Sequence, residues 1–237
     1  MSVKNHRVVS QKEWDAARKR FLLKEKTFTR QRDALSEARR ALPWVEVRKD
    51  YVFDGPKGRR SLSDLFDGRS QLIVYHFMFA PEWSAGCPHC SFWADNFNDV
   101  IVHLNQRDAS LAAVSRAPLK KLKAFKRRMG WDFQWLSSFA NDFNYDMGVS
   151  FRPSDMKARS YNCGTQQPGM TDREGVSVFY KDGKGRVFRT YSAYSRGIDL
   201  MNTAYNYLDL CPKGRDENGR GQFWVKHHDK YPRTKND

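Results

Sequence analysis

The chain has 237 residues, of which 40% are hydrophobic and 14% aromatic. This apolar content suffices for one main core and excludes a disordered chain. The longest apolar run, residues 72–80, contains His76 and is about half of what a membrane-spanning helix needs. The N-terminus has no apolar run followed by a cleavage site for secretion. We therefore expect a cytoplasmic protein without a membrane segment.

The net charge is +15 and the pI is about 9.8, which is typical of chains that bind nucleic acid or other acidic partners. The basic residues are densest in residues 18–40 and 120–128, where they leave an apolar helix stripe intact. We interpret them as a solvated helix surface in preference to a nucleic-acid footprint. A nucleic-acid partner is therefore disfavoured.

The first predicted element is a long helix. Ser10 and Glu13 have the spacing of a capping box, which marks its start. We expect residues 27–29 to divide the helix into two and Pro43 to end it. Residues 1–43 are predicted to be a helical arm that docks elsewhere, and a homo-oligomer formed through the arm is one such docking. The apolar face of the arm repeats every seven residues, at Trp14, Phe21, Phe28, Leu35 and Leu42.

Strands and helices alternate through the rest of the chain. Residues 45–53 alternate in polarity as a strand does, and residues 72–79 predict a strand buried on both faces. The later predicted elements are helix 91–105, strand 111–114, helix 118–129, strands 176–180 and 186–191, and helix 198–208. This order predicts an α/β fold: a thioredoxin-like mixed sheet with helices on both faces. It would occupy residues 44–210, with a polar insert at 152–174 and a C-terminal tail at 211–237.

The run GCPHC directly follows the buried strand and holds two of the four cysteines. Cys87 would begin a helix, where free backbone N–H groups and the helix dipole favour a thiolate. Pro88 suits the first helical turn, and a protonated or hydrogen-bonding His89 would favour the thiolate further. Cys90 lies about one turn on, within reach of Cys87 for a disulfide. The pattern predicts a redox dithiol in which Cys87 attacks and Cys90 resolves.

Other interpretations of these residues remain open. Cys87 and Cys90 could be inert thiols on a buried helix. A zinc site would need further ligands, and Cys163 and Cys211 are single and remote, so we expect no metal and no cofactor. Cys163 is interpreted as an unreactive loop thiol in preference to a third redox thiol. Residues 227–229, with the sequence His-His-Asp, are interpreted as a surface tail in preference to a metal site. Three tryptophans are expected in the core or the site walls: Trp83, Trp93 and Trp131.

Most of the chain resembles a bacterial thioredoxin-like family of unknown function that is commonly labelled predicted dithiol-disulfide oxidoreductases. The resemblance is carried by residues 78–131, which contain GCPHC, and by residues 13–26, 39–44, 143–151 and 175–217. It implies a fold related to peroxiredoxins, with Cys87 and Cys90 at the redox position. The dipeptide between the cysteines is similar to that of strongly oxidising periplasmic thioredoxin relatives.

Two departures accompany this resemblance. Thioredoxins carry a cis-proline just before the third sheet strand, where it shapes the substrate groove. The corresponding run, REGVSVF, has no proline, so Glu174 or Gly175 would take that place. The threonine-and-cysteine peroxide motif of peroxiredoxins is absent around Cys87.

Two functions follow as hypotheses. The first is a thiol-disulfide oxidoreductase that acts on protein or small-molecule thiols and disulfides. The alternative is a non-enzymatic basic binding module on a thioredoxin-like scaffold, with nucleic acid as its candidate ligand. In the first hypothesis the catalytic residues are Cys87, Cys90 and His89, and the residues that shape the site are Pro88, Trp83, Glu174 and Gly175.

Overall fold

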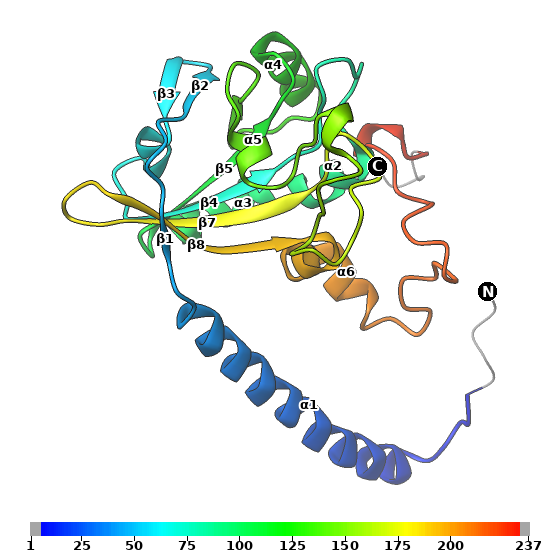
Figure 1. The fold of residues 1–237 in the computed structure, drawn as a ribbon. Helices are drawn as coiled ribbons and strands as arrows, with labels where there is room; N and C mark the ends of the chain where they lie inside the picture. Colours follow the sequence, from blue (N-terminus) through cyan, green and yellow to red (C-terminus); the bar gives the residue numbers. More distant parts are fainter. Residues whose placement is uncertain (1–5, 233–237) are drawn as a thin grey trace.

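The computed structural model describes residues 6–232, which contain an eight-stranded mixed sheet with helices on both faces (Figure 1). The order of strands across the sheet is β1-β8-β7-β4-β5-β6-β2-β3. Their bounds are β1 Val45–Glu46, β2 Val52–Gly55, β3 Gly58–Ser61, β4 Gln71–His76, β5 Ala109–Ser115, β6 Gln134–Ser137, β7 Gly175–Lys181 and β8 Val187–Tyr194.

The centre of the sheet follows the predicted order of strand, helix, strand, helix and hairpin. Strand β4 is parallel to β5 and antiparallel to β7, and β7 forms the hairpin with β8. The side chains of Leu72, Val74 and Tyr75 in β4 are fully buried. Because β4 has a neighbour at each edge and cover on each face, its residues 72–75 are apolar without interruption. The expected α/β fold, a thioredoxin-like mixed sheet with helices on both faces, is confirmed.

The two faces of the sheet carry separate cores. The core on one face includes Tyr75, Phe77 and Trp135 and is covered by helices, and the core on the other face includes Val74, Phe143 and Phe179. Short helices cover this second core: the 3-10 helix η1 (Ser63–Phe66) and α5 (Phe143–Asp146). The helices on the first core are α2 (Pro88–Ala94), α3 (Phe97–Asn105), α4 (Leu119–Arg128), the 3-10 helix η3 (Ser195–Met201) and α6 (Thr203–Leu208).

The prediction of one strand at residues 45–53 is wrong. Its first part is β1, which pairs with β8 at one edge, and its last part belongs to β2, which pairs with β3 and β6 near the other edge. The polar residues between β1 and β2 carry the chain from one edge of the sheet to the other. Lys49, one of them, pairs with Asp146 at 2.7 Å.

Two predicted helices are each divided in the structure. Helix 91–105 is divided because the side-chain amide of Asn96 donates to the carbonyls of Phe92 and Trp93 at 3.1 and 3.2 Å, which ends α2 before α3 begins. Helix 198–208 is divided at Asn202, whose side chain caps α6 by accepting the N–H of Tyr205 at 2.9 Å. Strand β6 was not predicted, because four residues give too short an alternation to detect.

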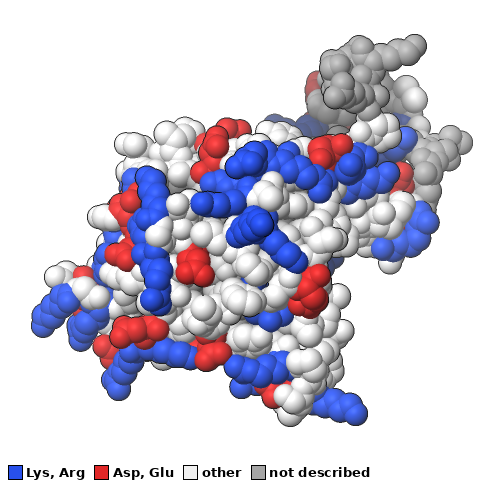
Figure 2. Space-filling model, turned by 90° about the horizontal axis from the view of Figure 1, so that it is seen from above, with Lys and Arg blue, Asp and Glu red and all other residues white. Residues whose placement is uncertain are grey.

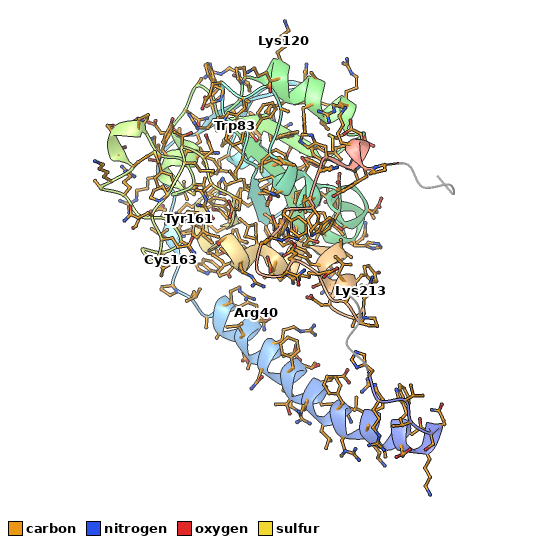
Figure 3. The ribbon with its side chains drawn as sticks, turned by 90° about the vertical axis from the view of Figure 1, so that its right-hand side faces the viewer. Arg40, Trp83, Lys120, Tyr161, Cys163 and Lys213 are labelled. Carbon is orange, nitrogen blue, oxygen red and sulfur yellow. The ribbon has the colours of Figure 1, made fainter. Side chains whose placement is uncertain are left out.

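The N-terminal arm is one helix, α1 (Gln11–Arg40), with the predicted capping box between Ser10 and Glu13. The predicted break at residues 27–29 is wrong. The hydroxyls of Thr27 and Thr29 donate to carbonyls one turn back, both at 3.0 Å, so both threonines fit within a continuous helix. No residue of Gln11–Arg40 is buried. From Arg40 toward its N-terminus, the helix extends away from the body (Figures 1 and 3).

The polar insert and the C-terminal tail both pack against the body. The insert contains the 3-10 helix η2 (Pro153–Asp155) and buries Tyr161, and the tail contains the 3-10 helix η4 (His228–Lys230) and buries Val225. Within residues 6–232, none of the helices combines the length and the apolar character that crossing a bilayer requires.

Candidate redox site at the start of helix α2

The loop between β4 and α2 is fixed by close packing at Gly86. A Cβ atom added to Gly86 would lie 2.7 Å from Cε1 of Phe77 and 3.1 Å from Cε1 of Phe125, so a side chain there would displace buried aromatic rings. The next residue, Cys87, donates its N–H to the carbonyl of Met78 at 3.0 Å. Cys87 is the N-cap of α2, and Pro88 occupies the first turn. The predicted start of this helix is confirmed.

The two cysteines of the run are free thiols held close together. Both are buried, with 8% of Cys87 and 2% of Cys90 exposed. The Cys90 thiol and the Cys90 backbone N–H both hydrogen-bond to the Cys87 sulfur. The Cys90 sulfur also accepts the N–H of Met78 at 3.4 Å. One sulfur is thus placed to stabilise a negative charge on the other.

The pKa values of the two thiols are displaced in opposite directions. The hydrogen bond from the Cys90 thiol, helped by His89, holds the pKa of Cys87 well below its usual value although burial opposes this. Burial and the neighbouring Cys87 sulfur raise the pKa of Cys90 well above its usual value. The hydrogen bond to Cys87 raises the pKa of His89, and the carbonyl of Gln222 contributes in the same direction. The geometry therefore favours a Cys87 thiolate beside a protonated Cys90 and a protonated His89.

The cysteines open into a pocket of about 320 Å³. Its inner wall includes Tyr75, whose buried hydroxyl lies beside Cys90 and has no hydrogen-bond partner within residues 6–232. The outer wall comes from the polar insert, from the residues after β8, and from the C-terminal tail. The lining residues are Tyr75, Met78, Cys87, His89, Cys90, Trp93, Met170, Arg173, Glu174, Ser195, Arg196, Ile198, Asp199 and Gln222.

The structure brings together four of the predicted site residues and separates the others. Cys87, His89, Cys90 and Glu174 line one pocket. The other three lie outside its lining. Pro88 begins α2, and Trp83 packs against the adjoining core while its carbonyl accepts Lys121 Nζ at 2.8 Å. Gly175 lies in β7, where an added Cβ would come within 2.8 Å of the Tyr194 ring. Every peptide bond in residues 6–232 is trans, including those of Glu174 and Gly175.

Tyr161 joins two walls of the pocket and was missed by the sequence analysis. Its hydroxyl donates to the carbonyl of Glu174 at 2.6 Å and accepts the N–H of Ser195 at 2.8 Å. It is 1% exposed although it lies in the polar insert. An aromatic residue within a polar stretch was the available signal, but nothing in the sequence indicates which surface it packs against.

The remaining cysteines lie away from the pocket. Cys163 and Cys211 are exposed, and neither lines the pocket that holds Cys87. Figure 3 shows Cys163 near Tyr161 and far from Trp83, which lies on the loop before α2. Within residues 6–232, no three His, Cys, Asp or Glu side chains are grouped so that they could hold a metal ion.

Residues 227–229 lie at the surface, as expected, with His228 and Asp229 exposed, but all three also contact the body. His227 contacts the carbonyl of Gly86 at 2.8 Å, and His228 contacts Asp95 at 2.7 Å. Asp229 forms two 2.8 Å bonds with Arg128 on α4. The sequence could not show this, because the partners are about 100 residues or more away in the chain.

A larger cavity of about 460 Å³ lies elsewhere, between the β2–β3 hairpin and helix α3. Its lining includes Arg69, Lys126 and Phe133 but none of the four cysteines. Its titratable residues include the pair of Arg69 with Asp67 at 3.2 Å but no thiol, so we place the candidate site at Cys87.

Figure 2 shows a face on which Lys and Arg are interspersed with Asp, Glu and uncharged residues. Part of the basic helix α4 is occupied within the molecule. Lys121 donates to the carbonyls of Pro81 and Trp83, at 2.6 and 2.8 Å, and Arg128 binds Asp229.

The fold is similar to those of several solved structures. Its solved structural neighbours include a peroxidoxin, BcpB, from Mycobacterium tuberculosis, with 18% identity, a TM-score of 0.47, and coverage of 68% of this chain and 93% of the other. Peroxiredoxin Q from Xanthomonas campestris has 16% identity, a TM-score of 0.44, and coverage of 68% and 91%. A mitochondrial 2-Cys peroxiredoxin from Plasmodium falciparum has 14% identity, a TM-score of 0.42, and coverage of 70% and 92%.

No curated protein matches the chain. The model of one family, described as a bacterial protein of unknown function (DUF899), matches residues 3–231. This match spans almost the whole sequence, including the dithiol helix, the insert and most of the tail. The chain therefore belongs to the bacterial DUF899 family.

Proposed function

We propose that the protein is a thiol-disulfide oxidoreductase in which Cys87 is the nucleophile and Cys90 the resolving thiol. One observation carries the proposal: two free thiols lie one helical turn apart at the start of α2 and line one pocket, where the contacts of Cys87 lower its pKa and burial raises that of Cys90. Thiolate is the reactive form of cysteine, so the displacement assigns attack to Cys87. Inert buried thiols would both have raised pKa values, because burial disfavours the charged form.

The reaction would proceed in two exchanges. The Cys87 thiolate attacks one sulfur of a substrate disulfide, which forms a mixed disulfide and releases the other sulfur as a thiolate that takes a proton from His89. Cys90 then loses its proton to the freed His89 or to solvent and attacks the Cys87 sulfur. The second substrate thiol leaves, and the Cys87–Cys90 disulfide remains. The substrate has gained two electrons and the enzyme has lost two, so a second thiol compound must reduce the enzyme for the next cycle.

The enclosure of the pocket supports small disulfides as substrates. Its volume of about 320 Å³ is at the lower end of the range for small-molecule sites. Cys87 is 8% exposed, so the disulfide of a folded protein cannot reach it without displacement of the insert or the tail. A slender disulfide compound can approach through the existing opening.

The direct test is turnover of a small disulfide, such as bis(2-hydroxyethyl) disulfide, with dithiothreitol as the reductant. We expect activity in the wild type and none in Cys87→Ser. Cys90→Ser should form the mixed disulfide and stop there, which intact-mass measurement detects as one adduct. Cys163→Ser and Cys211→Ser serve as matched controls and should keep the wild-type rate. Full activity in Cys87→Ser would disprove the proposal, and a preference for hydrogen peroxide over disulfides would redirect it to peroxidase chemistry.

A further inference from the structure

The C-terminal segment follows helix α2 from its beginning to its end. The contacts come from residues 217–231, which we call the C-terminal clasp. They reach the loop before α2, the His89 ring, the Phe92 ring and the C-cap residue Asp95. The proposed function does not use these contacts, and the sequence does not predict them.

At the start of α2 the clasp holds the peptide unit that leads into Cys87. His227 Nε2 lies 2.8 Å from the carbonyl oxygen of Gly86, and Arg128 Nη2 lies 3.2 Å from His227 Nδ1. Arginine can only donate, so Nδ1 accepts and Nε2 carries the hydrogen that it donates to Gly86. The N–H of the same peptide unit, which belongs to Cys87, donates to Met78. Both polar ends of this peptide are therefore fixed.

Two further residues fix His227 itself. Asp229 accepts from Arg128 through two bonds of 2.8 Å, a bidentate pair that orients the guanidinium toward His227. The Phe125 ring packs edge-on against the imidazole, with 5.2 Å between ring centroids. Phe125 also meets the space that a Gly86 side chain would occupy. The histidine, the glycine and the buried ring form one packed unit next to Cys87.

The clasp also reaches the middle and the end of α2. The Gln222 carbonyl hydrogen-bonds to His89, the ring that stabilises the Cys87 thiolate. The Trp224 ring packs edge-on against Phe92 at 5.3 Å, and its Nε1 donates to Glu217 at 2.9 Å. At the far end, His228 contacts Asp95, which also accepts Trp131 Nε1 at 2.8 Å. The dithiol helix is thus held at successive points along its length.

We propose that the C-terminal clasp positions the dithiol, with His227 as its principal positioning residue. This inference rests on the proposed function and deepens it. The Cys87 thiolate is stabilised by groups that must meet one sulfur atom within hydrogen-bond range: the Cys90 thiol, the Cys90 N–H and His89. Rotation of the Gly86–Cys87 peptide would move that sulfur away from all three. The bond from His227 opposes this rotation from the carbonyl side.

The test compares His227→Ala with His227→Gln, whose amide can still donate to Gly86. His103→Ala, at an exposed histidine on α3, is the matched control. We expect His227→Ala to raise the pKa of Cys87, measured by thiolate absorbance. Below the pKa values of both proteins, a tenfold loss of thiolate should slow reaction with a small disulfide about threefold, because a more basic thiolate is more nucleophilic. Above the pKa values of both proteins, where the reduced form carries the thiolate, the same tenfold change in the acid dissociation constant should lower the reduction potential by about 30 mV. His227→Gln should restore most of each change.

A second variant guards against a general folding defect. Asp229→Asn loosens Arg128 without touching the histidine, and it should shift the same two measurements in the same direction by a smaller amount. Thermal melting establishes that each variant is folded. The thiolate titration can be read whether or not the protein turns over a disulfide, so it tests the clasp independently of the proposed function. Unchanged thiolate pKa and potential in folded His227→Ala and Asp229→Asn would overturn the inference.

Discussion

The main chain of Met78 contacts both cysteines: its N–H donates to the Cys90 sulfur at 3.4 Å, and its carbonyl accepts the N–H of Cys87 at 3.0 Å. Met78 lies two residues beyond the end of β4 and directly follows Phe77, which is 1% exposed. The relative position of the two sulfurs is therefore set by the sheet as well as by α2. A dithiol held in this way can close into a disulfide with little backbone movement.

The opposite pKa displacements predict selective alkylation. In a Cys163→Ser, Cys211→Ser background, iodoacetamide should label Cys87 at neutral pH and leave Cys90 unlabelled. Because the Cys87 pKa is lowered, its labelling rate should be flat around neutrality and fall only as the pH drops through that lowered value. Cys90 should need a pH above its usual range. Peptide mapping by mass spectrometry gives both rates, and equal labelling of the two thiols at pH 7 would contradict the assignment.

Replacement of His89 by Ala should raise the pKa of Cys87 without restoring its ordinary value. The hydrogen bond from Cys90 is the larger cause of the lowered pKa, and it remains in this variant. Labelling of Cys87 should therefore slow at a pH below the pKa values of both proteins, with the difference from wild type shrinking as the pH rises through them. His103→Ala again controls for loss of a histidine. An unchanged labelling profile from pH 4 to 8 would show that His89 does not stabilise the thiolate.

His89 also makes the stability of the folded protein depend on pH, and the direction of this dependence follows from the direction of its pKa change. Its pKa is raised in the folded state, so its contribution to stability is complete below its ordinary value of 6.5 and is lost as the pH rises through the raised value. His89→Ala should therefore destabilise the reduced protein more at pH 6 than at pH 9. Urea unfolding at the two pH values measures this difference. Equal destabilisation at both would contradict the predicted ion pair.

Gly86 should tolerate no side chain. Gly86→Ala places a methyl group 2.7 Å from a Phe77 ring carbon and must move either the ring or the loop that carries Cys87. Overpacking of this kind destabilises proteins by about 1–3 kcal/mol. Gly183→Ala is the matched control, since nothing lies within 4 Å of a Cβ atom there. Thermal melting and the thiolate titration should both change for Gly86→Ala alone.

Sequence reasoning found the parts of the site that are close together in the chain. A buried strand followed by Gly-Cys-Pro-His-Cys is a local pattern, and it correctly placed Cys87 at the start of α2. The pocket walls are different, because Tyr161, Ser195 and Gln222 reach the site through tertiary packing of distant segments. Local sequence patterns also failed to predict where helices continue and where they end. Thr27 and Thr29 are compatible with one helix, whereas the side chain of Asn96 ends another.

The exposed arm predicts self-association that strengthens with salt. In the described chain, Trp14, Phe21, Phe28 and Leu35 are each more than half exposed along one stripe of α1. A second copy of the arm could cover this stripe, and the strict seven-residue repeat suits helix pairing. Helix α1 carries ten Lys and Arg against five Asp and Glu, so two arms repel each other until salt screens the charges.

Sedimentation velocity at low and high salt measures this association directly. We expect a dimer whose fraction rises with salt in the wild type and a monomer in the double variant Phe21→Glu, Phe28→Glu. The matched control is Lys19→Gln, Arg30→Gln, which makes the same change in net charge near the opposite face of α1. This control should dimerise at least as well as the wild type, because it reduces repulsion and keeps the stripe. A wild-type protein that stays monomeric at high salt would show that the arm does not pair with itself.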